Sequence, residues 1–204
     1  MVAVGVGVAG CGGEEEPPDY VGAGQVCGGL FAGPLAKTVE SVTGATSFAW
    51  SGTNGMQRVV DGLKAGYEEG RTLASGGRLC EMNPKGGALI DRSKIDFDIY
   101  PPQDLNEGYS NDEHYYTMGK RSGATSAGAF LYFECVSPQF KGSKERPLRV
   151  QGSFYHPKAT AQNTSEHMAA NMEILHAASL AVAKKLQCEK NGGLPEKPVL
   201  KPRI

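Results

Sequence analysis

The sequence lacks any long run of uncharged apolar residues, which excludes one way of attaching to a membrane. A transmembrane helix needs roughly 18 to 20 such residues in succession. No stretch of the 204-residue chain approaches that length. We therefore expect any membrane attachment to be peripheral or covalent.

An excess of charge of one sign is also missing. The chain has 21 lysines and arginines against 22 aspartates and glutamates, so its formal net charge is −1. A chain of this balance creates no field that would gather phosphate backbones from solution. Nucleic acid is therefore not an expected partner.

The cysteines form no close pair of the Cys-x-x-Cys type that zinc sites use. Cys11 stands apart near the N-terminus, while Cys27, Cys80, Cys135 and Cys188 are dispersed. Dispersed cysteines of even number predict two disulfides and an oxidising, extracytoplasmic compartment. Of three possible pairings we favour Cys27 with Cys80 and Cys135 with Cys188. Each disulfide would close a loop of the chain and stabilise the folded state by about 4 kcal/mol. Pairing Cys80 with Cys135 and Cys27 with Cys188 is the alternative.

Clusters of metal ligands are missing as well. No His-x-x-x-His pair occurs among the four histidines, which are His114, His156, His167 and His176. On a helix, His167 and His176 would lie about 180° apart, and we expect His176 to be a packed or capping residue. Asp96 and Asp98 share one face of a predicted strand, where alternating charge is the ordinary pattern of a wet face. We expect neither a metal nor a cofactor.

The N-terminal residues are small and apolar up to Cys11, and a polar segment rich in glutamate and proline follows. The sequence Val8-Ala9-Gly10-Cys11 resembles the lipobox of bacterial lipoproteins. The resemblance implies a diacylglyceryl group on Cys11, removal of residues 1–10 as the remnant of a signal peptide, and a solvated tether over residues 11–25. Two acyl chains suffice for lasting attachment. Because no Lys or Arg precedes the apolar run, we expect the reading frame to begin further upstream.

The same segment matches the dinucleotide-binding pattern Gly5-x-Gly7-x-x-Gly10. That pattern needs a full strand before it and a helix opening inside it. Only four residues precede Gly5, and Pro17-Pro18 follow. A nucleotide site is therefore not expected.

Three helices are predicted from apolar periodicity. The first spans Pro34–Thr43 and is closed by Gly44. The second begins after Asn54 and carries an apolar stripe to Tyr67, although three glycines would weaken it by roughly 1 kcal/mol each, so packing must hold it. The third covers residues 166–186, with Asn163 as its expected cap.

The period changes to two after the second helix, which predicts strands. Alternation is clearest over residues 94–100, and further strands are expected over 79–82, 115–120, 129–136 and 148–155. Because no helices alternate with these strands, we expect an α+β fold with a mostly antiparallel sheet and helices packed on one face, a two-layer sandwich. The expected domain is 26–194, with a C-terminal tail over 195–204.

Over most of residues 11–194, the chain resembles uncharacterised secreted lipoproteins of high-GC Gram-positive bacteria. The residues that carry the resemblance are Val26-Cys27-Gly-Gly-Leu before a helix, Leu79-Cys80 and Phe133-Glu-Cys135 on strands, and the closing stretch from His176 to Cys188. The resemblance implies export, lipidation and two cysteine pairs. It brings no known activity.

Two segments contain residue types that catalysis or binding could use. Ala124-Thr-Ser126-Ala-Gly128 is one residue away from the Gly-x-Ser-x-Gly elbow of hydrolases, but that elbow precedes a helix and here a strand is predicted. Around residues 111–116, His114, Tyr115 and Tyr116 could line a recognition surface with Tyr100 and Tyr109. Equally, these tyrosines could cover the sheet edge, in which case alanine substitution would cost thermal stability.

The expected function is therefore non-enzymatic. We expect a monomeric, lipid-anchored extracytoplasmic protein that binds or scaffolds an envelope protein or a small ligand. The alternative is a secreted hydrolase that uses Ser126 or an acidic pair.

Overall fold

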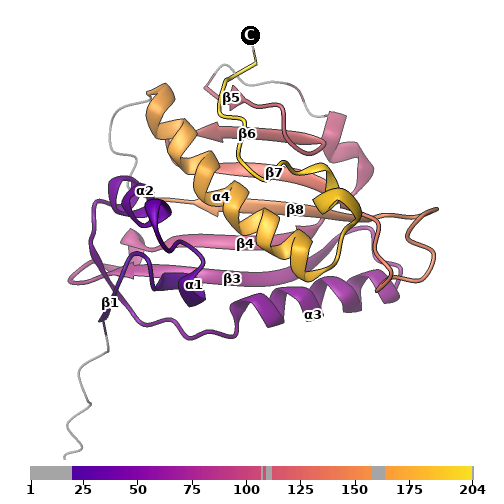
Figure 1. Cartoon of the computed structure of the whole chain (residues 1–204), viewed down its shortest axis with the longest axis horizontal. Coiled ribbons are helices and arrows are strands. Elements are labelled where there is room, and N and C mark those ends of the chain that lie inside the picture. Colours follow the sequence, from indigo (N-terminus) through magenta and orange to yellow (C-terminus); the bar gives the residue numbers. More distant parts are fainter. Residues whose placement is uncertain (1–19, 107, 109–111, 158–163, 204) are drawn as a thin grey trace, which may run out of the picture.

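The computed structural model describes residues 20–106, 108, 112–157 and 164–203. Within them, eight strands form one open sheet in the order β1-β2-β3-β4-β8-β7-β6-β5, and helices pack against it (Figure 1). All neighbouring strands are antiparallel. The predicted α+β fold is confirmed.

The strands of this sheet are β1 (Tyr20–Gly22), β2 (Ser47–Ala49), β3 (Ala74–Pro84), β4 (Ser93–Ile99), β5 (His114–Tyr115), β6 (Arg121–Thr125), β7 (Gly128–Cys135) and β8 (Leu148–Tyr155). The strands β4, β7 and β8 begin and end within one residue of their predicted bounds, whereas β3 extends beyond the predicted residues 79–82 at both ends.

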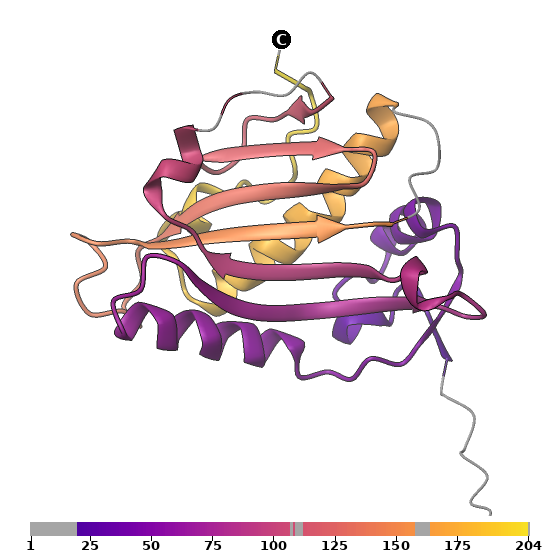
Figure 2. The ribbon, with the colours of Figure 1, turned by 180° about the vertical axis from the view of Figure 1, so that it is seen from behind.

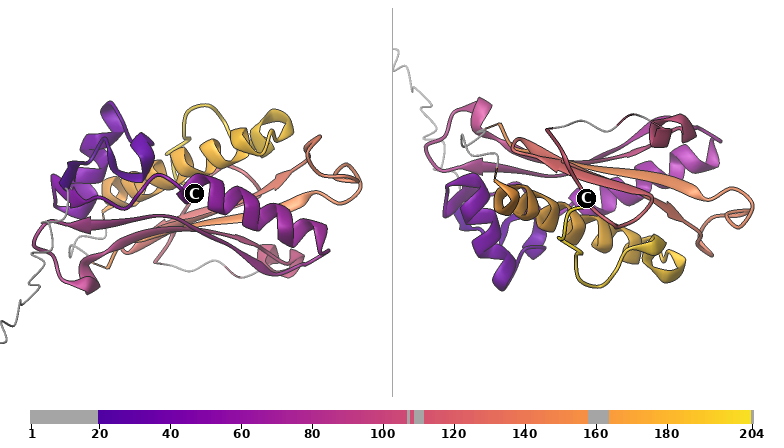
Figure 3. Two further views of the ribbon diagram at one scale, coloured as in Figure 1. Left: turned by 90° about the horizontal axis from the view of Figure 1, so that it is seen from below. Right: turned by 90° about the horizontal axis from the view of Figure 1, so that it is seen from above.

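Among the described residues, the α-helices lie on one side of this sheet or, for the helix that follows β2, along the outer edge of β3, and the opposite side carries no α-helix (Figures 2 and 3). They are α1 (Val26–Gly29), α2 (Pro34–Thr43), α3 (Gly55–Glu68) and α4 (Ser165–Lys185), with the 3-10 turns η1 (Leu89–Asp91), η2 (Pro102–Asn106) and η3 (Glu189–Gly193). Within the described residues, none of these helices combines the length and the apolar composition that a bilayer-spanning helix needs.

Strand alternation places the core between the sheet and the helices. In β4, Ile95, Phe97 and Ile99 are buried, while the residues between them are half-buried on the other face. On α4, Met172 and Leu175 are fully buried against the same side of the sheet. The core is therefore a single layer of side chains, as a two-layer sandwich requires.

The glycines of α3 let this helix lie unusually close to β3. A Cβ atom on Gly55 would overlap the carbonyl oxygen of Leu79, and a Cβ on Gly62 would overlap that of Gly76. The residues that lower the intrinsic stability of the helix are thus the ones that allow its backbone to pack directly on the strand. This close contact supplies the packing that a helix weakened by glycines needs.

The start of α4 differs in detail from the prediction. Thr164 is the N-cap, and its side-chain oxygen accepts a hydrogen bond from the backbone N–H of His167 at 3.2 Å. Asn163, the expected cap, lies outside the described residues. Threonine thus caps the helix one residue later than expected, and its oxygen satisfies the N–H of His167, an exposed group of the first turn.

The strand expected over 115–120 is wrong. Only His114–Tyr115 pair as β5, and the chain then turns at Gly119, whose φ is +60°, into β6. The backbone N–H of Tyr116 donates to Ser122 O at 3.0 Å across this hairpin. The strand β6 is not among the predicted strands, because its Ser, Gly and Ala side chains carry little apolar signal.

Both ends of the expected domain extend further than predicted. At the N-terminal end, Tyr20–Gly22 pair with β2 as strand β1, so the described end of the tether belongs to the sheet. At the C-terminal end, the backbone N–H of Arg203 donates to Tyr115 O at 2.7 Å. The segment expected as a tail therefore packs across the domain.

Candidate functional site

The four dispersed cysteines form two disulfides in the favoured pairing. Cys27 of α1 bonds to Cys80 of β3, with Cα atoms 5.2 Å apart. Cys135 at the end of β7 bonds to Cys188, directly after α4, with Cα atoms 4.9 Å apart. The two bonds fasten helical segments to the sheet at two separate points, and they indicate an extracytoplasmic compartment. Cys11 lies outside the described residues.

The described tyrosines that could have lined a recognition surface are buried. The exposed fractions are 0 % for Tyr100, 8 % for Tyr115 and 2 % for Tyr116. His114 is half-buried in β5, and Tyr109 lies outside the described residues. As buried side chains, the three tyrosines belong to the packing of the domain rather than to an exposed surface.

Two of these tyrosines join an aromatic cluster. The ring of Tyr100 meets that of Tyr132 edge-on at 4.8 Å, and Tyr115 meets Phe130 at 6.2 Å. The guanidinium of Arg121 lies 5.7 Å from the centre of the Tyr115 ring and donates to Asp104 O of η2 at 3.1 Å. The cluster thus anchors η2 to the helix-free side of the sheet, which is a packing role.

Ser126 lies in the turn between β6 and β7, so a strand follows it and the hydrolase elbow is absent. The ring of His167 approaches the backbone oxygen of Ser126, with Nε2 at 3.1 Å. The side-chain amide of Asn171 donates to Thr125 O at 2.9 Å. These contacts pin the turn to α4.

The two acidic residues of β4 have different partners, since Asp96 forms a surface ion pair and Asp98 a hydrogen bond with Ser75. Asp96 accepts from Arg78 Nε at 2.9 Å, and Glu81 bridges Arg78 and Arg92 at 2.8 and 2.7 Å. Burial raises the pKa of Asp98, and a hydrogen bond from Ser75 opposes that rise. Within the described part of the chain, no three His, Cys, Asp or Glu side chains gather as a metal site.

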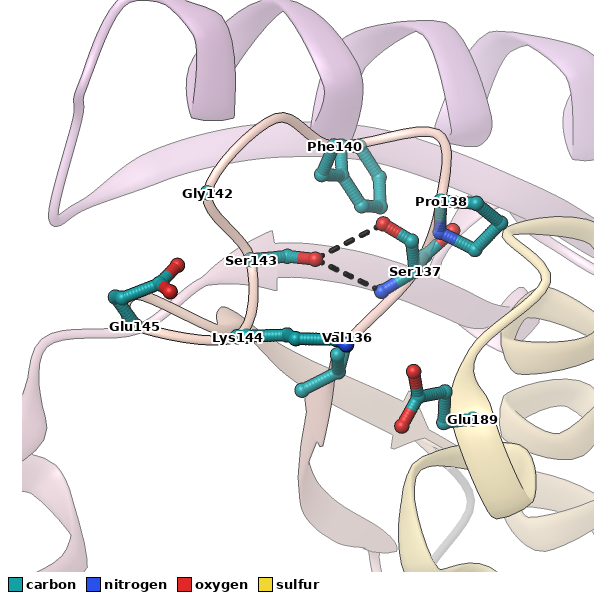
Figure 4. Close-up of a pocket in the computed structure, with 9 residues that line it drawn as sticks. All are labelled: Val136, Ser137, Pro138, Phe140, Gly142, Ser143, Lys144, Glu145 and Glu189. Atoms are coloured by element: carbon teal, nitrogen blue, oxygen red, sulfur yellow. Dashed lines mark hydrogen bonds between the residues drawn. The ribbon is translucent and has the colours of Figure 1, made fainter.

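A first hollow, of about 460 Å³, lies next to the disulfide between Cys135 and Cys188. Its lining includes Val136, which follows β7, and Glu189, which begins η3 (Figure 4). Ser143 accepts from the backbone N–H of Ser137 at 3.0 Å and donates to its carbonyl oxygen at 2.9 Å. The hydroxyl of Ser137 donates in turn to Leu186 O at 2.6 Å. The serine hydroxyls of this hollow therefore hold a loop together.

A second hollow, the α4 groove, combines an apolar floor with charged edges and has a volume of about 370 Å³. It runs along the outer surface of α4, between α2 and the C-terminal segment. Its lining residues are Leu35, Glu173, His176, Ala177, Leu180, Ala181, Lys184, Glu196 and Pro198.

His176 is the buried polar residue of the α4 groove. Only 2 % of it is exposed, and its Nε2 lies 2.9 Å from the carbonyl oxygen of Pro195. Because a carbonyl oxygen only accepts, Nε2 carries the proton in this bond. Burial lowers the pKa of His176, so the ring is held neutral. The prediction that His176 is a packed residue is confirmed.

The charged edges of the α4 groove are held by bonds between elements. Glu173 accepts from the hydroxyl of Thr38 on α2 at 2.9 Å. Lys184 contacts Glu196 at 2.6 Å, and Asn191 donates to the same carboxylate at 2.9 Å. The hydrogen bond from Lys184, followed by that from Asn191, lowers the pKa of Glu196. These edge groups are therefore positioned before any ligand arrives.

The sequence pointed to only one residue of the α4 groove, namely His176. The groove exists because Pro195 and Glu196 return to α4, and both residues belong to the segment that was expected to be a C-terminal tail. No pattern along the chain reports such a meeting of distant residues. Comparisons of the chain with protein-family models, with curated proteins and with solved structures found no match.

Proposed function

We propose that this protein is a lipid-anchored, non-enzymatic binding protein of the cell envelope that holds a small, mainly apolar ligand in the α4 groove. The observation that carries the proposal is the combination of an apolar floor, formed by side chains such as Leu180 and Ala181, with fixed polar groups at its edges. Ligand sites are typically concave and apolar, with a few placed polar groups and a volume of about 300 to 1,000 Å³.

The edge chemistry narrows the class of ligand. The neutral ring of His176 and the two carboxylates of Glu173 and Glu196 lie beside the single cation of Lys184. Since Lys184 is paired with Glu196, the groove offers an anionic ligand little free positive charge. A ligand with an apolar body and a hydroxyl, amide or amine at one end fits this arrangement.

Two further observations support an envelope location. The disulfides require an oxidising compartment, and the lipobox-like residues before Cys11 supply a means of attachment. Lipidation is tested by the intact mass of the native protein, which should correspond to a chain that begins at an acylated Cys11. A mass with an unmodified N-terminal segment and a free Cys11 thiol would contradict the anchor.

Binding to the α4 groove is tested with a fluorescent apolar probe, 1-anilinonaphthalene. Its emission should rise on addition of the folded protein, and Ala181→Trp should weaken its binding more than tenfold because the indole fills the groove. Ala170→Trp is the matched control, since Ala170 lies on the same helix about 20° away around its axis and does not line the groove.

The control variant should bind the probe as the unsubstituted protein does. Equal binding by all three forms, or no binding by the unsubstituted form, would contradict the proposal. Thermal unfolding of both variants separates loss of the site from loss of the fold.

A further inference from the structure

The hairpin that joins β3 to β4 exposes two large aliphatic side chains at its tip. Leu89 is 72 % exposed and Ile90 is 78 % exposed. Residues 85–90 are all exposed, and their one charged side chain is the cation of Lys85. An apolar tip with a basic residue at its base is costly in water and suits a surface that is apolar inside and polar at its boundary.

The tip is held rigidly by its own backbone. The N–H of Gly87 donates to Pro84 O at 2.9 Å, and the N–H of Asp91 donates to Ala88 O at 2.9 Å. The carboxylate of Asp91 accepts from the N–H of Ala88 at 3.0 Å. Leu89 and Ile90 are therefore presented outward by a structured turn.

The chain enters the domain beside this tip. The ammonium group of Lys85 lies 4.9 Å from the centre of the Tyr20 ring, and Tyr20 is the first described residue. Cys11 is nine residues earlier, so an extended connection reaches at most about 30 Å. In Figures 1 and 2, the β3–β4 hairpin and β1 lie at the same end of the molecule.

Other exposed aromatic side chains gather at this end. Tyr20 is 41 % exposed, and Trp50, which follows the strand paired with β1, is 47 % exposed. Tyr155 is 52 % exposed and pairs with Lys94 near the start of β4. Tyrosine and tryptophan are enriched where proteins meet the boundary of a bilayer, because one end of each ring system is apolar and the other is polar.

We propose that the tip of the β3–β4 hairpin inserts Leu89 and Ile90 into the lipid surface to which Cys11 is anchored. The inference rests on the lipid anchor of the proposed function. The anchor keeps the hairpin within reach of the bilayer, so that even the weak affinity of two side chains leads to contact. Docking at this end turns the α4 groove and the helix-free face sideways to the membrane.

The test uses the full chain coupled through the Cys11 thiol to a maleimide lipid in phospholipid vesicles. The other four cysteines are in disulfides, so coupling is directed to Cys11. In a Trp50→Phe background, Ile90→Trp places one tryptophan at the tip. Its emission should fall severalfold when the vesicle lipids carry brominated acyl chains.

Leu73→Trp in the same background is the matched control. Leu73 is 69 % exposed and precedes β3, an 11-residue strand, so it lies about 35 Å from the tip. Its emission should be insensitive to brominated lipids. Adding Leu89→Gln to the Ile90→Trp form should reduce the quenching, because half of the inserted apolar surface is removed.

Equal quenching at positions 90 and 73, or none at either, would overturn the proposal, and in the second case the tip belongs to a protein contact. This result is independent of natural lipidation, because the anchor is imposed chemically. An unacylated native Cys11 would remove the anchor of the proposed function and leave the quenching measurement valid.

Discussion

His176 on α4 donates a hydrogen bond to Pro195 O across 2.9 Å and so joins the longest helix to the segment that borders the α4 groove. Both the neutral ring with its proton on Nε2 and the protonated ring can donate this bond, but burial disfavours the charged form. His176 therefore couples the stability of the fold to pH.

We expect stability to fall in mild acid because of His176. Its folded pKa is lowered from 6.5 by burial, so the unfolded chain binds the proton more readily. The contribution is complete above the unfolded pKa and is lost as the pH falls below it, with a slope of at most about 1.4 kcal/mol per pH unit. Urea unfolding between about pH 8 and 5 measures this slope.

His176→Gln provides the comparison for that measurement. The amide nitrogen of glutamine can donate to Pro195 O without titrating. The variant should lose less stability than the native protein over the same pH interval. An identical fall in both proteins would exclude His176 as the cause.

Gly62→Ala should destabilise the protein by about 1 to 3 kcal/mol, because its Cβ would overlap the backbone of β3. In an exposed helix, the same change would stabilise by about 1 kcal/mol. Lys64→Ala on the same helix should be nearly neutral. Denaturant midpoints of the two variants decide the matter, and a stabilising Gly62→Ala would show that α3 is not in close contact with β3.

Tyr116→Phe is expected to preserve or raise stability. The hydroxyl of Tyr116 is buried and has no hydrogen-bond partner among the described residues, and burial raises the pKa of Tyr116 to about 12. Removing an unsatisfied hydroxyl can recover about 1 kcal/mol, whereas Tyr116→Ala should cost about 3 to 5 kcal/mol. Thermal melts of both variants test the prediction, and a harmless alanine would restore the surface interpretation.

Each disulfide should contribute about 4 kcal/mol, because both connect residues 53 positions apart. The double variant Cys135→Ser/Cys188→Ser should lose more than Cys27→Ser/Cys80→Ser, since Cys135 is fully buried and serine would place a hydroxyl there. Chemical denaturation of the two double variants gives the comparison. Equal losses would show that burial at Cys135 adds nothing.

The regular parts of the fold could be predicted because their local signals are strong. Pro34 and Gly44 mark α2 to the residue, and the alternation around Phe97 marks β4. For α2 and β4, the information lies within a few residues along the chain. The favoured disulfide pairing is correct as well, and it joins each strand cysteine to a cysteine in or just after a helix.

The candidate site could not be predicted in the same way. Pro195 meets His176 only because the chain doubles back after α4, and the burial of Tyr116 depends on β5 ending one residue earlier. The short strands β1 and β2 carry three residues each, too few for a period to show. Contacts between distant segments decide these features, and a linear pattern does not contain them.

The strand order ends in β1, with three residues, and β5, with two, and the N–H of Arg203 occupies the carbonyl oxygen of Tyr115. Among the described residues, β2 pairs only with Asn83 and Pro84 of β3, and the backbone of α3 lies against the carbonyl oxygens of Gly76 and Leu79 along the rest of that strand. A neighbouring copy therefore finds little open backbone at these edges with which to extend the sheet. This geometry works against the growth of fibres by strand pairing between adjacent molecules.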